Sequence, residues 1–372
     1  MRNLQQKLKY IFLMLMLTLF LSTGNTNVDA ASTLKVHFVD VGQGDATLIQ
    51  SGNKYSLIDT GTESNYPKLK AYLEKIGVKQ ITSLVLTHPD ADHIGGADLL
   101  MEDYKVNTIY MTSKTSKTME YKEVLNAIDN CDVGALKRVE KGDKIPFGSV
   151  KGKVLSADSK ASDTNDSSIV ILLKNKKNTF LFTGDASAKL ENKLANEYNI
   201  NVDVLKVSHH GSGYSSAALF LKETSPSISV ISVGKDNNYG HPDKYALKRI
   251  NLYSNKIYRT DKNGTIIVTS DGKKLKATVR GKSKTISTSP KKVTSSSSTS
   301  GNSSKTSKTS NTTTSTKNSE LTSSTVSTST VYITNTGSKY HNAGCRYLGN
   351  SKISINESDA KSRGYTPCSV CH

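Results

Sequence analysis

Four residues with metal-binding side chains crowd into positions 88 to 93, directly after an apolar run. The segment reads THPDADH and contains His88, Asp90, Asp92 and His93. Carboxylates and imidazoles this close titrate abnormally unless a cation lies among them. A single histidine or aspartate in a strand-end loop is more often a structural or turn residue. The crowding of four therefore favours metal coordination over an ordinary solvated loop.

Other potential ligands follow other apolar runs in the same way. Each lies at the C-terminal end of a predicted strand, and neighbouring strand ends would gather them into one cleft. Such a cleft would need a cation to offset its charge. The residues are Asp59 after YSLI, Asp185 after FLFTG, His209 and His210 after VLKVS, and His241 after ISVGKDNNYG.

The spacing within the loop indicates two metal ions. In His-x-Asp-x-Asp-His, His88 and Asp90 point toward one ion, whereas Asp92 and His93 turn toward a second. Asp185 would then bridge the pair, as two-metal hydrolases require at separations of about 3.5 to 4 Å.

The segments around these residues alternate between short strands and helices. Apolar runs with strand character recur from residue 34 to 270, bounded by Gly, Asn and Asp turns. Helix-like segments at 66–78 and 186–198 lie between them. Interleaved strands and helices over this length predict a layered α/β (α+β) domain with buried sheets.

Composition divides the chain into four predicted parts. Residues 1–30 combine basic residues, a short apolar stretch and a small residue at the end, which predicts a secretory signal peptide or, alternatively, an uncleaved anchor. Residues 31–280 form the main domain. Residues 281–330 are a Ser/Thr-rich linker that is too polar to fold and is predicted to be disordered. Residues 331–372 form a small module with three of the four cysteines.

The positive charge belongs to the tail. Residues 273–372 contain 16 Lys and Arg against 3 Asp and Glu, so they carry +13 of the formal net charge of +18. The tail is therefore expected to attract nucleic acid, an anionic cell-wall polymer or a membrane surface, without a choice among them. No stable membrane span is expected once the signal is cleaved.

The motifs LIDTG, THPDADHIGG, LFTGD, HHGS and YGHP resemble the metallo-β-lactamase superfamily. With FVDVGQGDATLI, the match over about residues 34–270 is similar in particular to the extracellular metallo-hydrolase domain of ComEC competence proteins. The resemblance implies a four-layer αββα sandwich with a dinuclear site at the sheet edge. By position it implies that Asp59 lies in the first motif, Asp185 bridges the ions and His241 is the last histidine ligand.

Two departures from the superfamily bear on the metal. Asp90 replaces the second histidine of the usual loop, and no histidine lies between His93 and His209. Asn165 or Asp166 either substitutes for the missing ligand or supports the site. Because more ligands are oxygens, Mn²⁺ or Mg²⁺ competes with Zn²⁺.

The expected chemistry is hydrolysis by a water molecule activated between two cations. Asp92, with Asp59 behind the loop, is expected to orient that water or the histidine ligands. His209 or His210 is expected to protonate the leaving oxygen. The glycine-rich segment with Asp45 forms either an anion-binding nest or a tight hairpin, and Asp45 is a candidate support residue.

The C-terminal module has the spacing of a zinc site. His341 and Cys345 precede Cys368 and Cys371, and this set fits a tetrahedral zinc site better than disulfides do. It resembles the metal-binding module of the Ada alkyl-repair protein, but His341 stands where that family has its methyl-accepting cysteine. His372 competes with His341 as the fourth ligand.

Three functions remain open from the sequence. The leading hypothesis is a secreted or cell-surface metal-dependent phosphodiesterase or nuclease that acts on DNA or another nucleic acid. The second is a cell-surface ester hydrolase, such as a teichoic-acid phosphorylcholine esterase. The third is a non-enzymatic protein that binds a surface or DNA through its tail and zinc module.

Overall fold

A computed structural model of the chain describes residues 33–279, 282–286, 330–334, 339–345, 348, 352–357, 360, 365–368, 370 and 371. The chain divides into two compact units, Met1–Val293 and Thr294–His372. The predicted signal peptide and most of the predicted linker lie outside the described residues.

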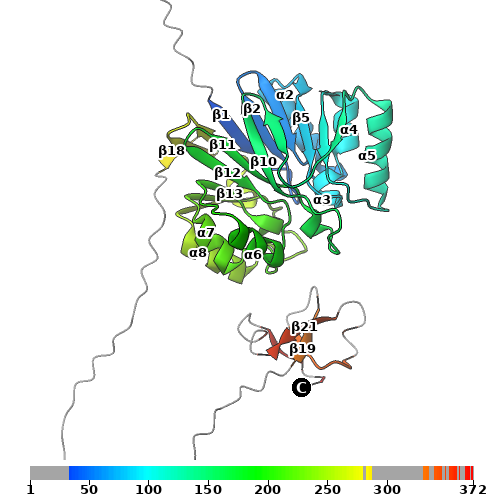
Figure 1. The fold of residues 1–372 in the computed structure, drawn as a ribbon, viewed down its shortest axis with the longest axis vertical. Helices are drawn as coiled ribbons and strands as arrows, with labels where there is room; N and C mark the ends of the chain where they lie inside the picture. The colour runs from blue at the N-terminus through cyan, green and yellow to red at the C-terminus, as the bar shows by residue number, and fades with distance from the viewer. Residues whose placement is uncertain are drawn as a thin grey trace, which may run out of the picture. The chain divides into compact units, whose positions relative to one another are not determined.

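The first unit contains two sheets that face each other (Figure 1). The first has the strand order β18-β17-β16-β1-β2-β3-β5-β7-β8. Its strands are β1 (Leu34–Phe38), β2 (Thr47–Ser51), β3 (Lys54–Ile58), β5 (Ser83–Leu86), β7 (Ile109–Met111), β8 (Leu136–Arg138), β16 (Ile266–Ser270), β17 (Leu275–Val279) and β18 (Lys282–Ile286). A separate pair joins β4 (Gln80–Ile81) to β6 (Lys105–Val106).

The second sheet has the order β15-β14-β13-β12-β11-β10-β9. Its strands are β9 (Lys144–Phe147), β10 (Val150–Ser156), β11 (Val170–Asn175), β12 (Asn178–Phe182), β13 (Val204–Lys206), β14 (Ile228–Ile231) and β15 (Lys256–Arg259). Side chains of both sheets form one core, in which the rings of Phe38 and Phe182 lie 6.3 Å apart. This shared core holds the two inner layers together through apolar burial.

Helices cover the outer face of each sheet (Figure 1). The first sheet packs against α2 (Tyr66–Ile76), α4 (Ala97–Asp103) and α5 (Met119–Asn130), and the second against α6 (Ala188–Glu197), α7 (Ala218–Thr224) and α8 (Lys244–Tyr253). Shorter helices are η1 (Glu63–Asn65), α3 (Ala91–Ile94), η2 (Asn165–Ser167), η3 (Ser208–Gly211) and α9 (Thr260–Asn263). The predicted four-layer αββα fold is confirmed.

Strand direction brings the reactive residues together. Strands β3, β5, β7 and β8 run parallel in the first sheet, and β12, β13, β14 and β15 run parallel in the second. The C-terminal ends of parallel neighbours meet at one edge of their sheet, where crevices form. The loops that leave these ends carry the predicted ligands.

The boundary after the main domain differs from the predicted one. Strand β18 lies inside the segment that composition predicts as linker, and it pairs antiparallel with β17 from Lys282–Val279 to Ile286–Leu275. Backbone pairing extends the sheet here, although the Lys/Ser/Thr sequence has little apolar character.

The second unit contains a small sheet of order β21-β19-β20-β22. Its strands are β19 (Thr330–Ile333), β20 (Lys339–His341), β21 (Ile353–Asn356) and β22 (Thr366–Pro367). Throughout the described parts of both units, no helix combines the length and apolar character that a membrane span needs.

Candidate metal centre

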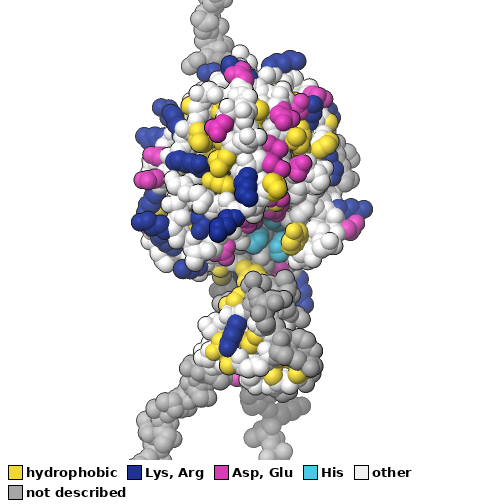
Figure 2. Space-filling model, turned by 90° about the vertical axis from the view of Figure 1, so that its right-hand side faces the viewer, with side chains coloured by type: hydrophobic (Ala, Val, Ile, Leu, Met, Phe, Trp, Pro, Cys, Tyr) yellow, Lys and Arg dark blue, Asp and Glu magenta, His cyan; other side chains and the backbone are white. Residues whose placement is uncertain are grey.

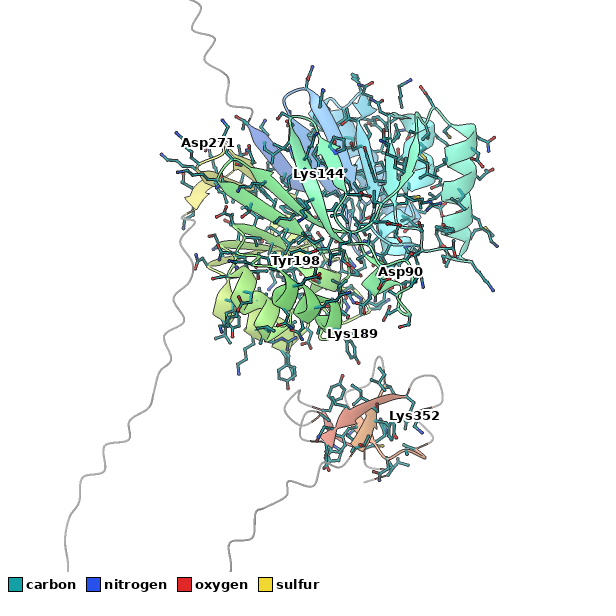
Figure 3. All side chains as sticks on the ribbon, viewed as in Figure 1. Asp90, Lys144, Lys189, Tyr198, Asp271 and Lys352 are labelled. Atoms are coloured by element: carbon teal, nitrogen blue, oxygen red, sulfur yellow. The ribbon has the colours of Figure 1, made fainter. Side chains whose placement is uncertain are left out.

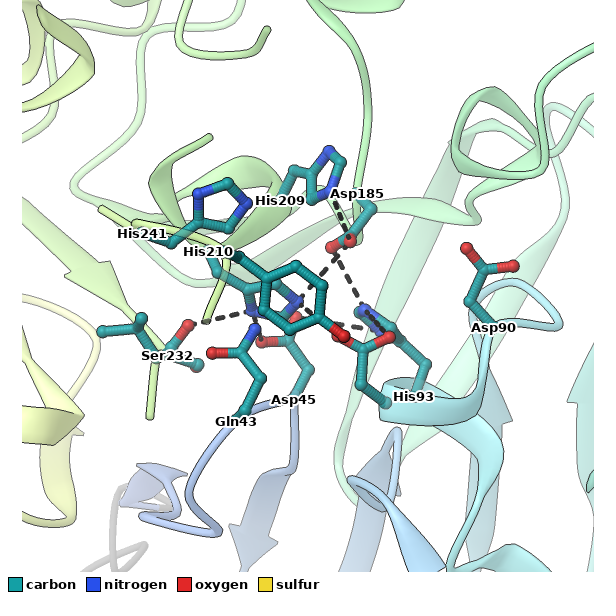
Figure 4. Close-up of polar contacts among 12 residues, drawn as sticks. Gln43, Asp45, Asp90, His93, Asp185, His209, His210, Ser232 and His241 are labelled. Carbon is teal, nitrogen blue, oxygen red and sulfur yellow. Dashed lines mark hydrogen bonds and ion pairs between the residues drawn. The ribbon is translucent and has the colours of Figure 1, made fainter. Parts of the chain in front are cut away.

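Seven histidine and aspartate side chains converge where the two sheets end, and Figure 4 labels four of them, Asp45, His93, Asp185 and His210. All seven come from the β1–β2 loop, the end of β3, the β5–α3 loop, helix α3, the end of β12 and η3 after β13. The seven are Asp45, Asp59, His88, Asp92, His93, Asp185 and His210, and each belongs to at least one group whose ligand atoms lie within 4.8 Å of one another. Figure 2 shows histidine side chains reaching the surface beside acidic and hydrophobic ones.

The β1–β2 loop lies directly against the metal-binding loop. The backbone N–H of Asp45 donates to the carbonyl of Asp92 at 3.0 Å. Gly44 has φ +118°, and a Cβ added there would lie 2.3 Å from the same carbonyl oxygen. Only glycine tolerates both this conformation and this approach. The glycine-rich motif therefore serves to bring Asp45 into the cleft.

Asp59 orients the imidazole of His93. Its Oδ1 accepts from the backbone N–H of Thr87 and its Oδ2 from the Thr87 hydroxyl, both at 2.8 Å. Oδ2 also lies 2.9 Å from His93 Nδ1. Because a carboxylate accepts at Nδ1, the proton of the neutral ring is held there and Nε2 is left with a lone pair. That Nε2 lies 3.1 Å from Asp185 Oδ1.

His210 and His88 are held in the same way. His210 Nδ1 donates to the carbonyl of Ser232 at 2.9 Å, and its Nε2 lies 3.0 Å from Asp92 Oδ2. His88 Nδ1 lies 3.1 Å from the Thr87 hydroxyl. In all three histidines a protein group engages Nδ1, and Nε2 is directed into the cleft.

Several buried ligand atoms in the cleft lack hydrogen-bond partners, and cations could take the place of such partners. The Nε2 atoms of His88, His93 and His210 and the Oδ1 of Asp185 are buried and lack a hydrogen-bond partner of acceptable geometry. Burying one such atom unsatisfied costs about 1 to 3 kcal/mol. Divalent cations would satisfy all four atoms at once, because imidazole nitrogen and carboxylate oxygen are their usual ligands.

Asp185 lies between two halves of this cleft. Its Oδ1 faces His93, whereas its Oδ2 lies 3.5 Å from His210 Nε2 and 3.7 Å from His209 Nε2. Its backbone N–H donates to the Ser168 hydroxyl, which fixes the carboxylate after β12. The two oxygens therefore face different sets of ligands.

Burial and neighbouring charges shift the pKa values of the histidines and aspartates in this cleft. Burial lowers the pKa of His210, but the charges of Asp185 and Asp45 outweigh burial and raise this pKa to about 10. Burial also lowers the pKa of His93, but Asp185 and Asp59 outweigh burial and raise this pKa well above its usual value. For Asp185, burial is outweighed by these histidines and its pKa falls well below the usual range. The imidazoles thus take up protons that a cation must displace before it binds.

A buried lysine that the sequence analysis did not single out completes the charge balance. Lys206 is 2% exposed at the end of β13, and its Nζ lies 2.5 Å from Asp45 Oδ2. Burial raises the pKa of Asp45, but Lys206 and then His210 lower it to about 2. The Lys206 ammonium therefore pairs with the Asp45 carboxylate. Asp185 and Asp92 are then the carboxylates that remain beside His93 and His210. The sequence feature that could have identified Lys206 is its position as a charged residue inside the apolar run VDVLKVS.

The loop after β13 holds its two histidines in a strained backbone. His209 and His210 have φ of 49° and 51°, in the left-handed region that costs a non-glycine residue about 1 to 2 kcal/mol. Glu191 of α6 accepts from the Ser208 hydroxyl at 2.6 Å and from the Ala217 N–H at 2.7 Å. Arg249 of α8 donates to carbonyls of the same loop. These contacts hold the loop at both ends.

Glu191 gives a pH-dependent stability that we expect to be measurable. Burial raises its pKa from 4.5 to about 7. The folded state therefore binds a proton that the unfolded state releases, and stability falls as pH rises from about 4.5 to 7. Glu191→Gln keeps the neutral shape and should be about 3 kcal/mol more stable than the wild type at pH 8, but equal at pH 4. Parallel curves of unfolding free energy against pH for the two proteins would refute this.

Four predicted site residues of the first unit, Asp90, Asp166, His209 and His241, lie outside the candidate ligand groups. Asp90 has a side chain that is 38% exposed, lies toward the surface (Figure 3) and is 3.6 Å from His88 Nε2. Asp166 accepts from the backbone N–H of Ser187 instead of facing the cleft. The ring of His241 lies 5.6 Å from that of His209, and burial lowers its pKa to about 4. His210 Nε2, by contrast, lies 3.0 Å from Asp92 Oδ2, and His210 belongs to two of the candidate groups.

The second unit holds a separate cluster. The donor atoms of His341, Cys345, Cys368 and Cys371 lie within 4.8 Å of one another, and the three cysteines are free thiols. His341 Nδ1 is 3.2 Å from Cys345 Sγ and 3.9 Å from Cys371 Sγ. His372, the competing ligand, lies outside the described residues. Cys131 of the first unit is half-buried against the core of the first helical layer.

Comparison with known proteins agrees with this fold. Residues 39–154 match the family model described as metallo-beta-lactamase superfamily. The chain carries a metallo-beta-lactamase superfamily domain. The matched superfamily typically binds divalent metal ions, and the histidine and aspartate groups of this domain would allow such binding.

Relatives of this metallo-beta-lactamase domain include Competence protein ComA of Neisseria gonorrhoeae, which is 30% identical over 233 residues. The domain is also 32% identical over 252 residues to ComE operon protein 3 of Bacillus subtilis and 30% identical over 242 residues to Recombination protein 2 of Haemophilus influenzae. The last two matches cover 62% and 63% of this chain but only 32% and 29% of the relatives, so the chain spans about a third of their length.

The metallo-beta-lactamase fold protein YhfI from Bacillus subtilis aligns over 64% of this chain and 100% of its own, with 14% identity and a TM-score of 0.46.

Proposed function

We propose that the first unit is a metal-dependent phosphodiesterase that acts on nucleic acid outside the cell. One observation carries the proposal: three buried imidazoles, each fixed at Nδ1, direct unpartnered Nε2 atoms toward Asp185. The relatives named for competence favour DNA as the polymer that such a site meets.

Two divalent ions, Zn²⁺ or Mn²⁺, are the proposed cofactors. His88 and His93 with Asp185 Oδ1 would hold one, and His210 and Asp92 with Asp185 Oδ2 the other. When bound, such ions activate water and neutralise the charge that develops on a phosphoryl oxygen. Asp59 and the Ser232 carbonyl keep the rings of His93 and His210 turned so that Nε2 faces the cleft.

His209 is the proposed proton donor to the leaving oxygen. Its side chain is 26% exposed, in contrast to the buried His93 and His210, and its Nε2 lies 3.7 Å from Asp185. His210, with its Nε2 among the carboxylates, is better placed to bind a cation than to meet a leaving group.

His209→Ala should therefore lower kcat by about 10²- to 10⁴-fold, because it removes a proton donor, without reducing the number of metal ions bound. Metal content by mass spectrometry and turnover of the same preparation check both halves. If metal content and activity fall together, His209 is a ligand and the proposed role is refuted.

The tail and second unit are proposed to serve attachment. A single Zn²⁺ bound by His341, Cys345, Cys368 and Cys371 would hold this small unit together. The excess of Lys and Arg in residues 273–372 would attract DNA or an anionic wall polymer.

A substrate panel tests the function. The purified chain is incubated with Mn²⁺, Mg²⁺ or Zn²⁺ and single-stranded DNA, duplex DNA, RNA, bis-p-nitrophenyl phosphate or phosphorylcholine-bearing teichoic acid. We expect metal-dependent cleavage of the nucleic acids and the small diester. Release of phosphorylcholine without nucleic-acid cleavage would favour the wall-esterase hypothesis, and no turnover with any ion would leave a binding protein.

A further inference from the structure

We propose that Tyr239 is a stacking platform that binds an unpaired nucleobase beside the candidate metal centre. This inference rests on the proposed function and adds a substrate preference, for single strands over duplexes. It comes from an exposed ring, a rigid loop and a continuous series of ring contacts into the cleft.

Tyr239 is an exposed ring at the entrance to the site. It is 67% exposed, whereas the nearby histidines are largely covered. One face stacks on His241, with centroids 5.9 Å apart and an interplanar angle of 26°. Because most of the Tyr239 surface is exposed, the ring remains accessible to a flat ligand.

Ring contacts connect this platform to the reactive groups. The ring of His241 meets that of His209 edge-on at 5.6 Å, and His209 Nε2 lies 3.7 Å from Asp185. A nucleic-acid strand whose phosphate lies at Asp185 would therefore pass its neighbouring base along this side of the cleft.

The loop that carries Tyr239 is held in place before any ligand arrives. The Asn237 amide donates to the carbonyls of Gly234 and His241 at 3.0 and 2.7 Å. Its Oδ1 accepts from the N–H groups of Tyr239 and His241 at 3.2 and 3.0 Å. A side chain on an already ordered backbone loses less entropy on binding than one on a mobile loop. This rigidity distinguishes Tyr239 from an incidental surface tyrosine.

A base fits this geometry better than a quaternary ammonium group. Cages for choline surround the cation with several aromatic faces, whereas Tyr239 offers one flat face backed by an imidazole. Base–aromatic stacking is tolerant of sequence and contributes about 1 to 3 kcal/mol per base. Bases in a duplex are already stacked and are not available, so single strands are preferred.

The test compares oligonucleotides with and without bases. Fluorescence anisotropy measures the affinity of the full chain, in Mn²⁺ buffer, for oligothymidylate and for an abasic strand of equal length, both phosphorothioate-linked to slow cleavage. Tyr239→Ala should weaken oligothymidylate binding about 5- to 150-fold, the stacking energy converted at tenfold per 1.4 kcal/mol. It should change abasic binding by less than about twofold, and Tyr239→Phe should bind like the wild type because the ring suffices.

Tyr245→Ala is the matched control. Tyr245 is also exposed, but its ring is covered by the Lys244 ammonium at 4.9 Å and does not stack on a histidine of the site. Equal losses on both strands, no loss on either, an equal loss in the Tyr245 control, or displacement of oligothymidylate by choline would each overturn the proposal. The binding measurement does not depend on turnover. If the protein is inactive but Tyr239→Ala still weakens binding only to the strand with bases, the hydrolase function is refuted and the Tyr239 proposal stands.

Discussion

Asp185→Asn is expected to lose both bound metal and hydrolytic activity. The two oxygens of Asp185 face separate groups of ligands, and His93 and His210 lie 3.1 and 3.5 Å from them. A neutral amide keeps the shape but cannot balance two adjacent cations. Because removal of a group that only orients a ligand typically costs 10- to 100-fold in metal affinity, we expect a loss of at least about 100-fold. Metal titration followed by isothermal calorimetry measures it.

Asp166→Asn is the control for this variant. Asp166 is an aspartate near the same cleft, but its Oδ1 accepts only from the backbone N–H of Ser187 among its described contacts. It should bind metal like the wild type. Wild-type affinity in Asp185→Asn, or an equal loss in Asp166→Asn, would contradict the bridging position of Asp185.

Lys206→Met is expected to destabilise the fold by about 3 to 5 kcal/mol, because it leaves the buried carboxylate of Asp45 without its ammonium partner. Lys206 and Asp45 are 2% and 4% exposed, so water cannot replace the lost charge. Urea unfolding of the metal-free protein measures the change in unfolding free energy.

Two further variants make this result specific. Lys206→Met combined with Asp45→Asn removes both charges and should recover part of the lost stability. Lys174→Met removes an exposed lysine from β11 of the same sheet and should change stability by less than about 0.5 kcal/mol. A loss in Lys206→Met no larger than that of Lys174→Met would show that the buried pair contributes little.

The sequence predicts the fold and the general location of the site because both depend on local patterns. Apolar runs that end in Asp59, His88 or Asp185 identify strands and their C-terminal ends, and parallel topology then brings those ends together. Spacing alone predicts that Asp92 and His93 face the same ion, whereas in the structure His93 faces Asp185 together with His88 and Asp92 faces His210.

The remaining features depend on tertiary geometry that spacing does not encode. His210 rather than His241 reaches the carboxylates, because a left-handed backbone at His209 and His210 turns the second ring inward. The sequence alone does not show that Lys206 pairs with Asp45, because this pairing depends on the position of β13 in the fold. Tyr239 is visible as a platform only once its ring is seen to stack on His241.

An anomalous-scattering map of crystals grown with Mn²⁺ tests the central claim most directly, because it locates metal ions without reference to a substrate. The geometry predicts two peaks on either side of Asp185, about 3.5 to 4 Å apart, one beside His88 and His93 and the other beside His210 and Asp92. An absence of peaks in this cleft at saturating Mn²⁺, or a single peak that does not contact Asp185, would contradict the two-metal account.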